Sequence, residues 1–276
     1  MRTIALFAVA AALMLGQASP NQARPNNDLG YTDTPMLPGL PFHVHDPARP
    51  HPPQVTPAAQ SGGAPSDAIV LFDGRDTSQW TLRPPQNPRA NAPQSWKLEN
   101  GILEVAPNAG DMITKLTFGD MQLHVEWSAP AEVRGNSQNR GNSGIFLQGL
   151  YEVQVLDNWN NPTYADGQTG ALYGQWPPLA NPARKPGEWQ TYDIFFEAAR
   201  MDGDRMVKPA YVTVMLNGVL LHHHKELMGP TVHRELAKYT AQPPEGPLVL
   251  QDHQTPVRYR NIWARRIGAY DAPEKK

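Results

Sequence analysis

From Ile69 onward the apolar segments of this chain are short, and turn residues separate them at close intervals. Short runs rich in Val, Ile, Leu, Trp and Tyr are typical of β-strands. No long stretch has helical periodicity, although a short helix is predicted near residues 232–239. We predict strands at residues 69–72, 95–98, 102–105, 121–128, 144–148, 151–156, 190–197, 211–216, 219–223, 248–251 and 258–266.

Two Asn-Gly pairs mark hairpins between predicted strands. Asn100-Gly101 and Asn217-Gly218 each lie between two apolar runs, and both residue types tolerate the positive φ of a tight β-turn. Many antiparallel strands without alternating helices indicate a sandwich or a barrel. The sequence therefore predicts an all-β fold.

The first residues of the chain have the composition of an export signal. Residues 4–15 form an apolar run behind Arg2 that is too short to span a bilayer, and Gly16-Gln17-Ala18 supplies small residues for a signal peptidase. We predict that residues 1–18 are a signal peptide and that the protein is periplasmic or secreted, without membrane insertion. Because the chain has no Cys, we expect no lipoprotein anchor, disulfide or thiolate site.

The next segment differs sharply from the rest. Residues 19–66 are rich in proline, which disfavours helices and central strands, so we predict an extended arm. Residues 67–270 are predicted to form the β-sandwich domain, and residues 271–276 a C-terminal tail. The chain has 24 basic and 26 acidic residues, so it lacks the excess of positive charge that is typical of nucleic-acid-binding proteins. The expected partner is a neutral small molecule, and the sequence does not determine the oligomeric state.

Alternation within two predicted strands places polar side chains on one face of each. In residues 121–128 the polar face carries His124 and Glu126, and in residues 151–156 it carries Glu152 and Gln154. We expect both rows to line one concave, substrate-binding sheet, with Glu126, Glu152 and Gln154 converging in a single hollow. The alternative is an ordinary solvated outer face, which has the same pattern.

Glu152-x-Gln154-x-x-Asp157 has the spacing of the Glu-x-Asp-x-x-Glu signature of β-glucanases, whose catalytic strand is bulged. A bulge would return Asp157 to the face of Glu152, where two carboxylates can act as acid and base around a glycosidic bond. The central Gln and the terminal Asp depart from that signature. They disfavour an ordinary glucanase mechanism.

Further candidate residues lie in turns and loops. Trp159 and Tyr173 belong to a long loop, where their rings either hold the apolar faces of sugars or pin the loop onto its own domain. Arg140 and Asn142 precede a strand and either offer hydrogen-bond donors or form a plain turn. His253 ends a strand, in a position suited to proton transfer or to a structural hydrogen bond.

The histidines of the arm do not form a convincing metal motif. We interpret His43-x-His45-Asp46 as surface capping and expect no metal site. No cofactor is indicated. A divalent cation would serve some of the roles discussed below, but nothing in the sequence calls for one.

Six segments, taken in order, resemble the 3-keto-disaccharide hydrolase family: LFDGRDTSQW, WKLENGILEV, GNSGIFLQGLYEVQVLDN, TGALYGQWPPLANPARKPGEWQTYDIFFEAAR, VTVMLNGVLL and GPLVLQDH…VRYRNIWARRI. The resemblance runs from about Ile69 to Ile267. It implies a concanavalin A-like jelly-roll β-sandwich of two antiparallel sheets. It also implies cleavage of glycosides that carry a ketone at C3.

A ketone at C3 acidifies the proton on C2, so that a base can form an enolate that expels the C1 substituent, and water then adds back. In that scheme Glu152 is the expected base and Asp157 or His253 the proton donor. The remaining expected roles are donors to the keto or enolate oxygen (Arg140, Asn142, Gln154), partners for sugar hydroxyls (His124, Glu126) and ring platforms (Trp159, Tyr173). The alternatives are a non-catalytic carbohydrate-binding module and an ordinary β-glucanase.

Overall fold

The computed structural model describes residues 29–85 and 91–271. These residues divide into two compact units, of which the first reaches Pro52 and includes Asp271, and the second runs from Pro53 to Tyr270. The signal peptide predicted at residues 1–18 lies outside the described residues, so export stays a prediction. Within the described ranges, no helix is long and apolar enough to cross a membrane.

The first unit is held together by turns and polar contacts. Met36 and His43 pair as an isolated antiparallel bridge, and the carboxylate of Asp46 accepts hydrogen bonds from the backbone N–H groups of His43 and Ala48. These bonds lower the pKa of Asp46. Arg49 forms an ion pair with Asp271 at 2.7 Å.

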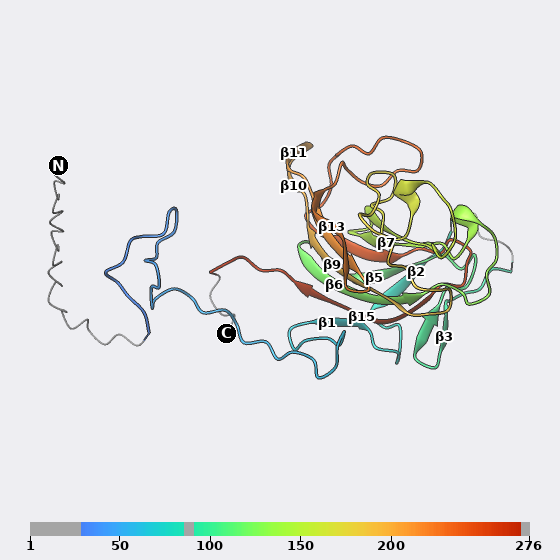
Figure 1. The fold of residues 1–276 in the computed structure, drawn as a ribbon, viewed down its shortest axis with the longest axis horizontal. Helices are drawn as coiled ribbons and strands as arrows, with labels where there is room; N and C mark the ends of the chain where they lie inside the picture. The colour runs from blue at the N-terminus through green and yellow to red at the C-terminus, as the bar shows by residue number, and fades with distance from the viewer. Residues whose placement is uncertain (1–28, 86–90, 272–276) are drawn as a thin grey trace, which may run out of the picture. The chain divides into compact units, whose positions relative to one another are not determined.

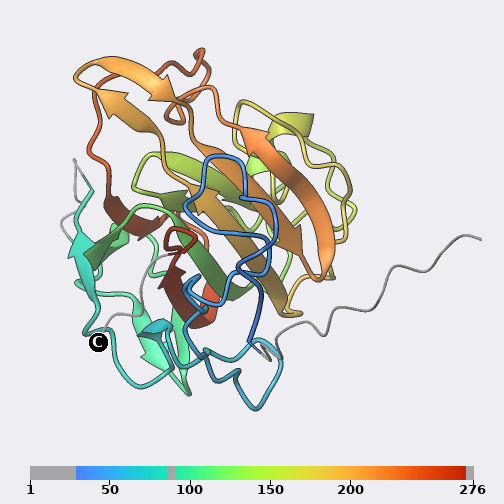
Figure 2. The same cartoon turned by 90° about the vertical axis from the view of Figure 1, so that its left-hand side faces the viewer.

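The second unit is a sandwich of two antiparallel β-sheets, seen from two directions in Figures 1 and 2. In the larger sheet the order is β13-β12-β9-β6-β15-β4-β3, with β1 also pairing with β15, and in the smaller sheet it is β2-β5-β14-β7-β8. The strands of the larger sheet are β1 (Ile69–Phe72), β3 (Lys97–Glu99), β4 (Ile102–Glu104), β6 (Met121–Ser128), β9 (Gln190–Glu197), β12 (Tyr211–Leu216), β13 (Val219–Glu226) and β15 (Arg258–Arg266). The strands of the smaller sheet are β2 (Trp80–Arg83), β5 (Asp111–Phe118), β7 (Ser143–Leu147), β8 (Tyr151–Val155) and β14 (Gly246–Leu250).

Smaller elements complete the described chain. A separate two-stranded sheet consists of β10 (Arg200–Asp202) and β11 (Arg205–Lys208). Two single 3₁₀ turns, η1 (Ser137–Asn139) and η2 (Ala165–Gly167), lie in the loops on either side of β7 and β8. The all-β prediction is confirmed, and the long loops that follow β8 are drawn in yellow-green in Figure 1.

The core lies between the two sheets and is built from alternate residues of their strands. The apolar rows predicted for β6 and β8 are both buried there, namely Met121, Leu123, Val125, Trp127, Tyr151, Val153 and Val155. Because successive side chains of a strand point to opposite faces, the residues between them face away from the core. This alternation fixes the direction of every polar side chain on the two strands.

Both predicted Asn-Gly hairpins are confirmed. Asn100 and Gly101 have φ of 51° and 76° between β3 and β4, and Asn217 and Gly218 have φ of 53° and 80° between β12 and β13. An Asn-Gly pair suits these turns because both central residues need positive φ.

The helix predicted near residues 232–239 is wrong, since this segment forms only turns and irregular backbone. The C-terminal end of this segment is held by the hydroxyl group of Tyr239. The Tyr239 hydroxyl accepts a hydrogen bond from the Ala210 backbone N–H at 2.7 Å and donates to the Leu227 carbonyl at 2.8 Å. These contacts hold the segment as a loop before β14 begins.

Candidate active site

The polar rows of β6 and β8 point in opposite directions. The two strands belong to different sheets, and both turn their apolar rows to the shared core. Glu126 and His124 therefore lie on the outer face of the larger sheet, and Glu152 and Gln154 on the outer face of the smaller one. The expectation that Glu126 converges with Glu152 and Gln154 is wrong.

His124 and Glu126 instead hold a chain segment against the larger sheet. His124 Nδ1 is 2.7 Å from the carboxylate of Asp193. Asn261 Nδ2 lies 2.8 Å from Glu126 Oε1 and 2.8 Å from the Gly62 carbonyl oxygen. Gly62 also leaves little room, because a Cβ at this position would lie 3.2 Å from the His124 ring. The predicted role in holding sugar hydroxyls does not fit these two residues, since the protein's own groups already occupy them.

A cavity of about 440 Å³ opens on the outer face of the smaller sheet. Its walls come from β7, β8 and four loops, and they contain Gln138, Asn139, Asn142, Phe146, Glu152, Gln154, Tyr164, Tyr173, Thr231, His233, Gln251 and His253. Of the residues singled out in the sequence, the cavity brings together Glu152, Gln154, Asn142, Tyr173 and His253. We refer to it as the Glu152 cavity.

Glu152 is a buried carboxyl group without a counter-charge. The residue is 6% exposed, and no described residue forms a hydrogen bond or an ion pair with its carboxyl oxygens. Desolvation raises its pKa to about 8, because burial disfavours the charged form. Gly144 of β7 lies directly against it, since a Cβ there would be 2.5 Å from Glu152 Oε1.

A network of amides forms one wall of the Glu152 cavity. The Gln154 amide nitrogen donates to Gln138 Oε1 at 3.0 Å and to Asn142 Oδ1 at 3.3 Å, and the Asn142 amide nitrogen donates to the Gln138 carbonyl at 2.7 Å. The predicted donation from Gln154 and Asn142 to a keto oxygen does not fit, because the donors already have partners in the protein.

Two acceptors of the same cavity lack a partner. Among the described residues, the buried Oε1 atoms of Gln154 and Gln251 accept no hydrogen bond. An unsatisfied buried polar atom is destabilising, and such atoms call for a specific explanation in native proteins. A ligand with hydroxyl groups would supply the missing donors.

Two histidines and two tyrosines also line the cavity. The Tyr164 and Tyr173 hydroxyls are 2.6 Å apart, and the Tyr173 hydroxyl is 3.0 Å from His233 Nδ1. Desolvation raises the pKa of Tyr173, so the phenol stays protonated. Desolvation also lowers the pKa of His253, which favours the neutral imidazole.

Several lining residues were not predicted from the sequence. Gln251 had a usable signal, because it stands two residues before His253 and side chains two apart share one face of an extended segment. Gln138, Thr231 and His233 lie in loops whose path follows from no local pattern. Only the folded chain brings them to Glu152.

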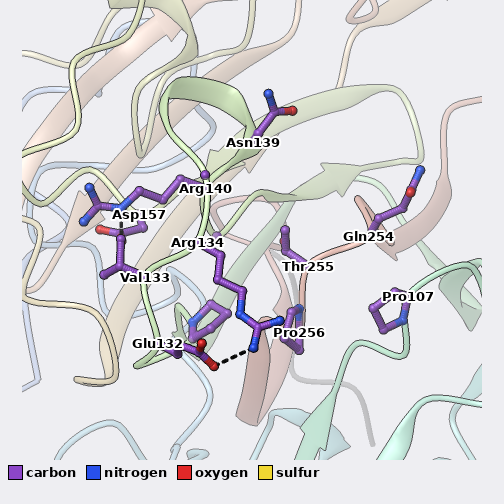
Figure 3. A pocket seen from close by; sticks show the side chains of 13 residues that line it. Pro107, Glu132, Val133, Arg134, Asn139, Arg140, Asp157, Gln254, Thr255 and Pro256 are labelled. Atoms are coloured by element: carbon purple, nitrogen blue, oxygen red, sulfur yellow. Dashed lines mark hydrogen bonds and ion pairs between the residues drawn. The ribbon is translucent and has the colours of Figure 1, made fainter.

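Asp157 and Arg140 lie in a different cavity, of about 520 Å³, shown in Figure 3. They form a largely buried ion pair at 2.6 Å, and Arg140 also donates to the Trp159 carbonyl at 2.8 Å. No bulge returns Asp157 to the face of Glu152, because β8 keeps a regular register with β7 and ends at Val155. The predicted roles of Asp157 as proton donor and of Arg140 as keto-oxygen donor do not fit this arrangement.

Trp159 does not act as a platform in either cavity. Its ring lies beside the Lys185 ammonium group, 5.7 Å from the ring centroid, and it lines neither the Glu152 cavity nor the Asp157 cavity. Among residues 29–85 and 91–271, no three His, Asp or Glu side chains are grouped so as to hold a metal ion.

Comparison with known proteins agrees with the resemblance seen in the sequence. The model of a family described as 3-keto-alpha-glucoside-1,2-lyase-like domain matches residues 67–265. A proposed glycosyl hydrolase from Parabacteroides distasonis is 44% identical, and the match covers 84% of this chain and 100% of that one with a TM-score of 0.73. A second proposed glycosyl hydrolase from the same organism shares the fold at 18% identity, covering 78% of this chain and 100% of that one with a TM-score of 0.52.

A search among curated proteins finds no match. The expected concanavalin A-like jelly-roll sandwich is nevertheless confirmed by the strand order and by these solved structures. With the family match covering most of the sandwich unit, the protein has a role in glycoside processing and belongs to the 3-keto-alpha-glucoside-1,2-lyase-like family.

Proposed function

We propose that the Glu152 cavity cleaves glycosides that carry a ketone at C3, by elimination followed by hydration. The observation that carries this proposal is that, among the described residues lining the cavity, Glu152 is the one carboxylate. An ordinary glycosidase places two carboxyl groups across the bond it cleaves. Proton removal beside a ketone needs a single base, and Glu152 fits that requirement.

The raised pKa suits Glu152 to this reaction. A base with a pKa of about 8 accepts a proton more readily than an ordinary carboxylate, and its pKa lies close to a neutral operating pH. Glu152 removes the proton from C2, and the electrons of the C2–H bond form the enolate of the C3 ketone. The enolate then expels the alcohol from C1, and the protonated Glu152 returns its proton to the departing oxygen. Water finally adds across the C1–C2 double bond, which completes a net hydrolysis.

Other groups of the cavity supply binding and charge stabilisation. The neutral imidazole of His253 donates a hydrogen bond to the enolate oxygen, as neutral histidines do in other enolising enzymes. The free carbonyl oxygens of Gln154 and Gln251 accept hydrogen bonds from sugar hydroxyls. Tyr173, which lines the cavity from the loop after β8, contacts the sugar ring.

Three incubations test the proposal: with 3-keto-trehalose, with trehalose, and with an unoxidised β-glucan. Release of glucose from 3-keto-trehalose alone is the expected result. Binding of a sugar without any turnover would identify a carbohydrate-binding module and refute the enzyme. Cleavage of the unoxidised glucan would identify a glucanase and remove the need for a ketone.

A further inference from the structure

A second cavity, of about 670 Å³, adjoins the Glu152 cavity. The two share Gln138, Tyr164, Tyr173 and His233 as a common wall. We call this second cavity the outer cavity. A leaving group directed past the shared wall from a sugar beside Glu152 would enter it.

The outer cavity exposes apolar side chains to solvent. Leu236 is 92% exposed, Tyr164 45% and Val232 39%, and all three line the cavity. A single exposed leucine needs no explanation. Two aliphatic side chains and a tyrosine ring around one cavity, next to a site with convergent polar groups, are typical of a ligand site.

The loop that carries two of these side chains is anchored to the proposed catalytic strand. The Thr231 backbone N–H donates to the Leu150 carbonyl at 2.8 Å, and the Thr231 hydroxyl accepts from the Glu152 backbone N–H at 2.9 Å. Val232 follows this anchor directly, and Leu236 lies four residues further along the same loop. The start of the loop is therefore held by the same strand that carries Glu152.

We propose that the outer cavity binds an aromatic aglycone rather than a second sugar, an inference that rests on the proposed function of the Glu152 cavity. Val232 and Leu236 offer no hydrogen-bond partner to the hydroxyl groups of a sugar, so a sugar would have to bind through the polar lining residues, namely Gln138, Asp166, His233, Arg234 and Glu235. A planar ring gains contact with both side chains and can pack against the ring of Tyr164. The charged side chains of Arg234 and Glu235, which also line the cavity, suit polar substituents on such a ring.

The test compares two 3-keto-α-glucosides that differ only in the leaving group, namely the 3-keto form of 4-nitrophenyl α-glucoside and 3-keto-trehalose. In the Leu236→Ser variant we expect kcat/KM for the nitrophenyl substrate to fall about 5- to 10-fold, because apolar contact area is lost. The value for 3-keto-trehalose should stay within about twofold. No change, or an equal change for both substrates, would overturn the inference.

The matched control is Leu179→Ser. Leu179 is 75% exposed but lines neither of the two cavities. We expect this variant to keep the wild-type kcat/KM for both substrates. A loss for the nitrophenyl substrate equal to that of Leu236→Ser would show a general surface effect and overturn the inference.

A binding measurement separates this inference from the proposed function. By calorimetry, wild-type protein should bind unoxidised 4-nitrophenyl α-glucoside at least about fivefold more tightly than trehalose, and Leu236→Ser should remove that preference. If this preference is present but no 3-keto substrate is cleaved, the proposed function fails and the aglycone site stands. If 3-keto substrates are cleaved without any preference in binding or in kcat/KM, the aglycone site fails and the proposed function stands.

Discussion

Replacement of Glu152 by Gln should stabilise the protein at alkaline pH while abolishing turnover. Burial raises the pKa of this carboxyl from its ordinary value of 4.5 to about 8. At a pH between these two values, the Glu152 carboxyl keeps its proton in the folded protein and releases it in the unfolded chain. The folded state then binds more protons, so the stability of the wild type falls as pH rises through this window. Gln keeps the shape of the side chain and does not ionise.

The size of the effect follows from the two pKa values. A tenfold change in an ionisation constant corresponds to about 1.4 kcal/mol. The free energy of unfolding lost by the wild type through this group is then about 1 kcal/mol at pH 5 and about 4 kcal/mol at pH 8. The advantage of Glu152→Gln over the wild type should therefore grow by about 3 kcal/mol between these conditions.

Urea unfolding of both proteins at pH 5 and pH 8, followed by tryptophan fluorescence, measures this difference. Glu188→Gln serves as the control, because Glu188 is an exposed loop residue, and its effect should differ by less than about 0.5 kcal/mol between the two conditions. An advantage for Glu152→Gln that is equal at pH 5 and pH 8 would refute the assignment of an uncompensated buried carboxyl. Wild-type turnover of 3-keto-trehalose by the variant would remove Glu152 from the reaction.

Four further predictions concern the same region. The kcat/KM of the wild type for 3-keto-trehalose should rise with pH to a plateau, with an apparent pKa near 8 from Glu152; a flat profile from pH 6 to 9 would exclude this base. His253→Ala should lower kcat about 10²- to 10³-fold through loss of the enolate donor, with little change in urea unfolding because the residue is exposed; a kcat within threefold of wild type would contradict this. Gln251→Met should raise KM about fivefold without loss of stability, because it removes an unpartnered acceptor; an unchanged KM would argue against sugar contact. Asp157→Asn should cost about 3 kcal/mol in urea unfolding, because it leaves Arg140 without its partner in a largely buried pair, and loss of turnover at unchanged stability would place Asp157 in the reaction.

The strands missed by the sequence analysis show where local patterns are insufficient. β5 (Asp111–Phe118) contains Asp111 and Lys115, and its burial does not alternate regularly. It is nevertheless a strand because β2 and β14 pair with it on both sides. Pairing with strands that are distant in the chain produces no alternating pattern of apolar residues within the segment itself.

The sequence by itself determined the all-β class, the two Asn-Gly hairpins and the common face of Glu152 and Gln154. These features follow from side-chain period and turn chemistry, which act over a few residues. It did not determine to which sheet each strand belongs. The alternation of side chains tells which residues of a strand share a face, but it does not tell on which outer side of the sandwich that face lies.

Strand order decided the composition of the site. By placing β6 and β8 in different sheets, the fold sends Glu126 to the opposite side of the molecule. Because β8 ends before Asp157, the Asp157 carboxylate forms an ion pair with Arg140 and does not join Glu152. The loops then bring His253 and Tyr173 to Glu152, and they do so through contacts between residues that are far apart in the chain.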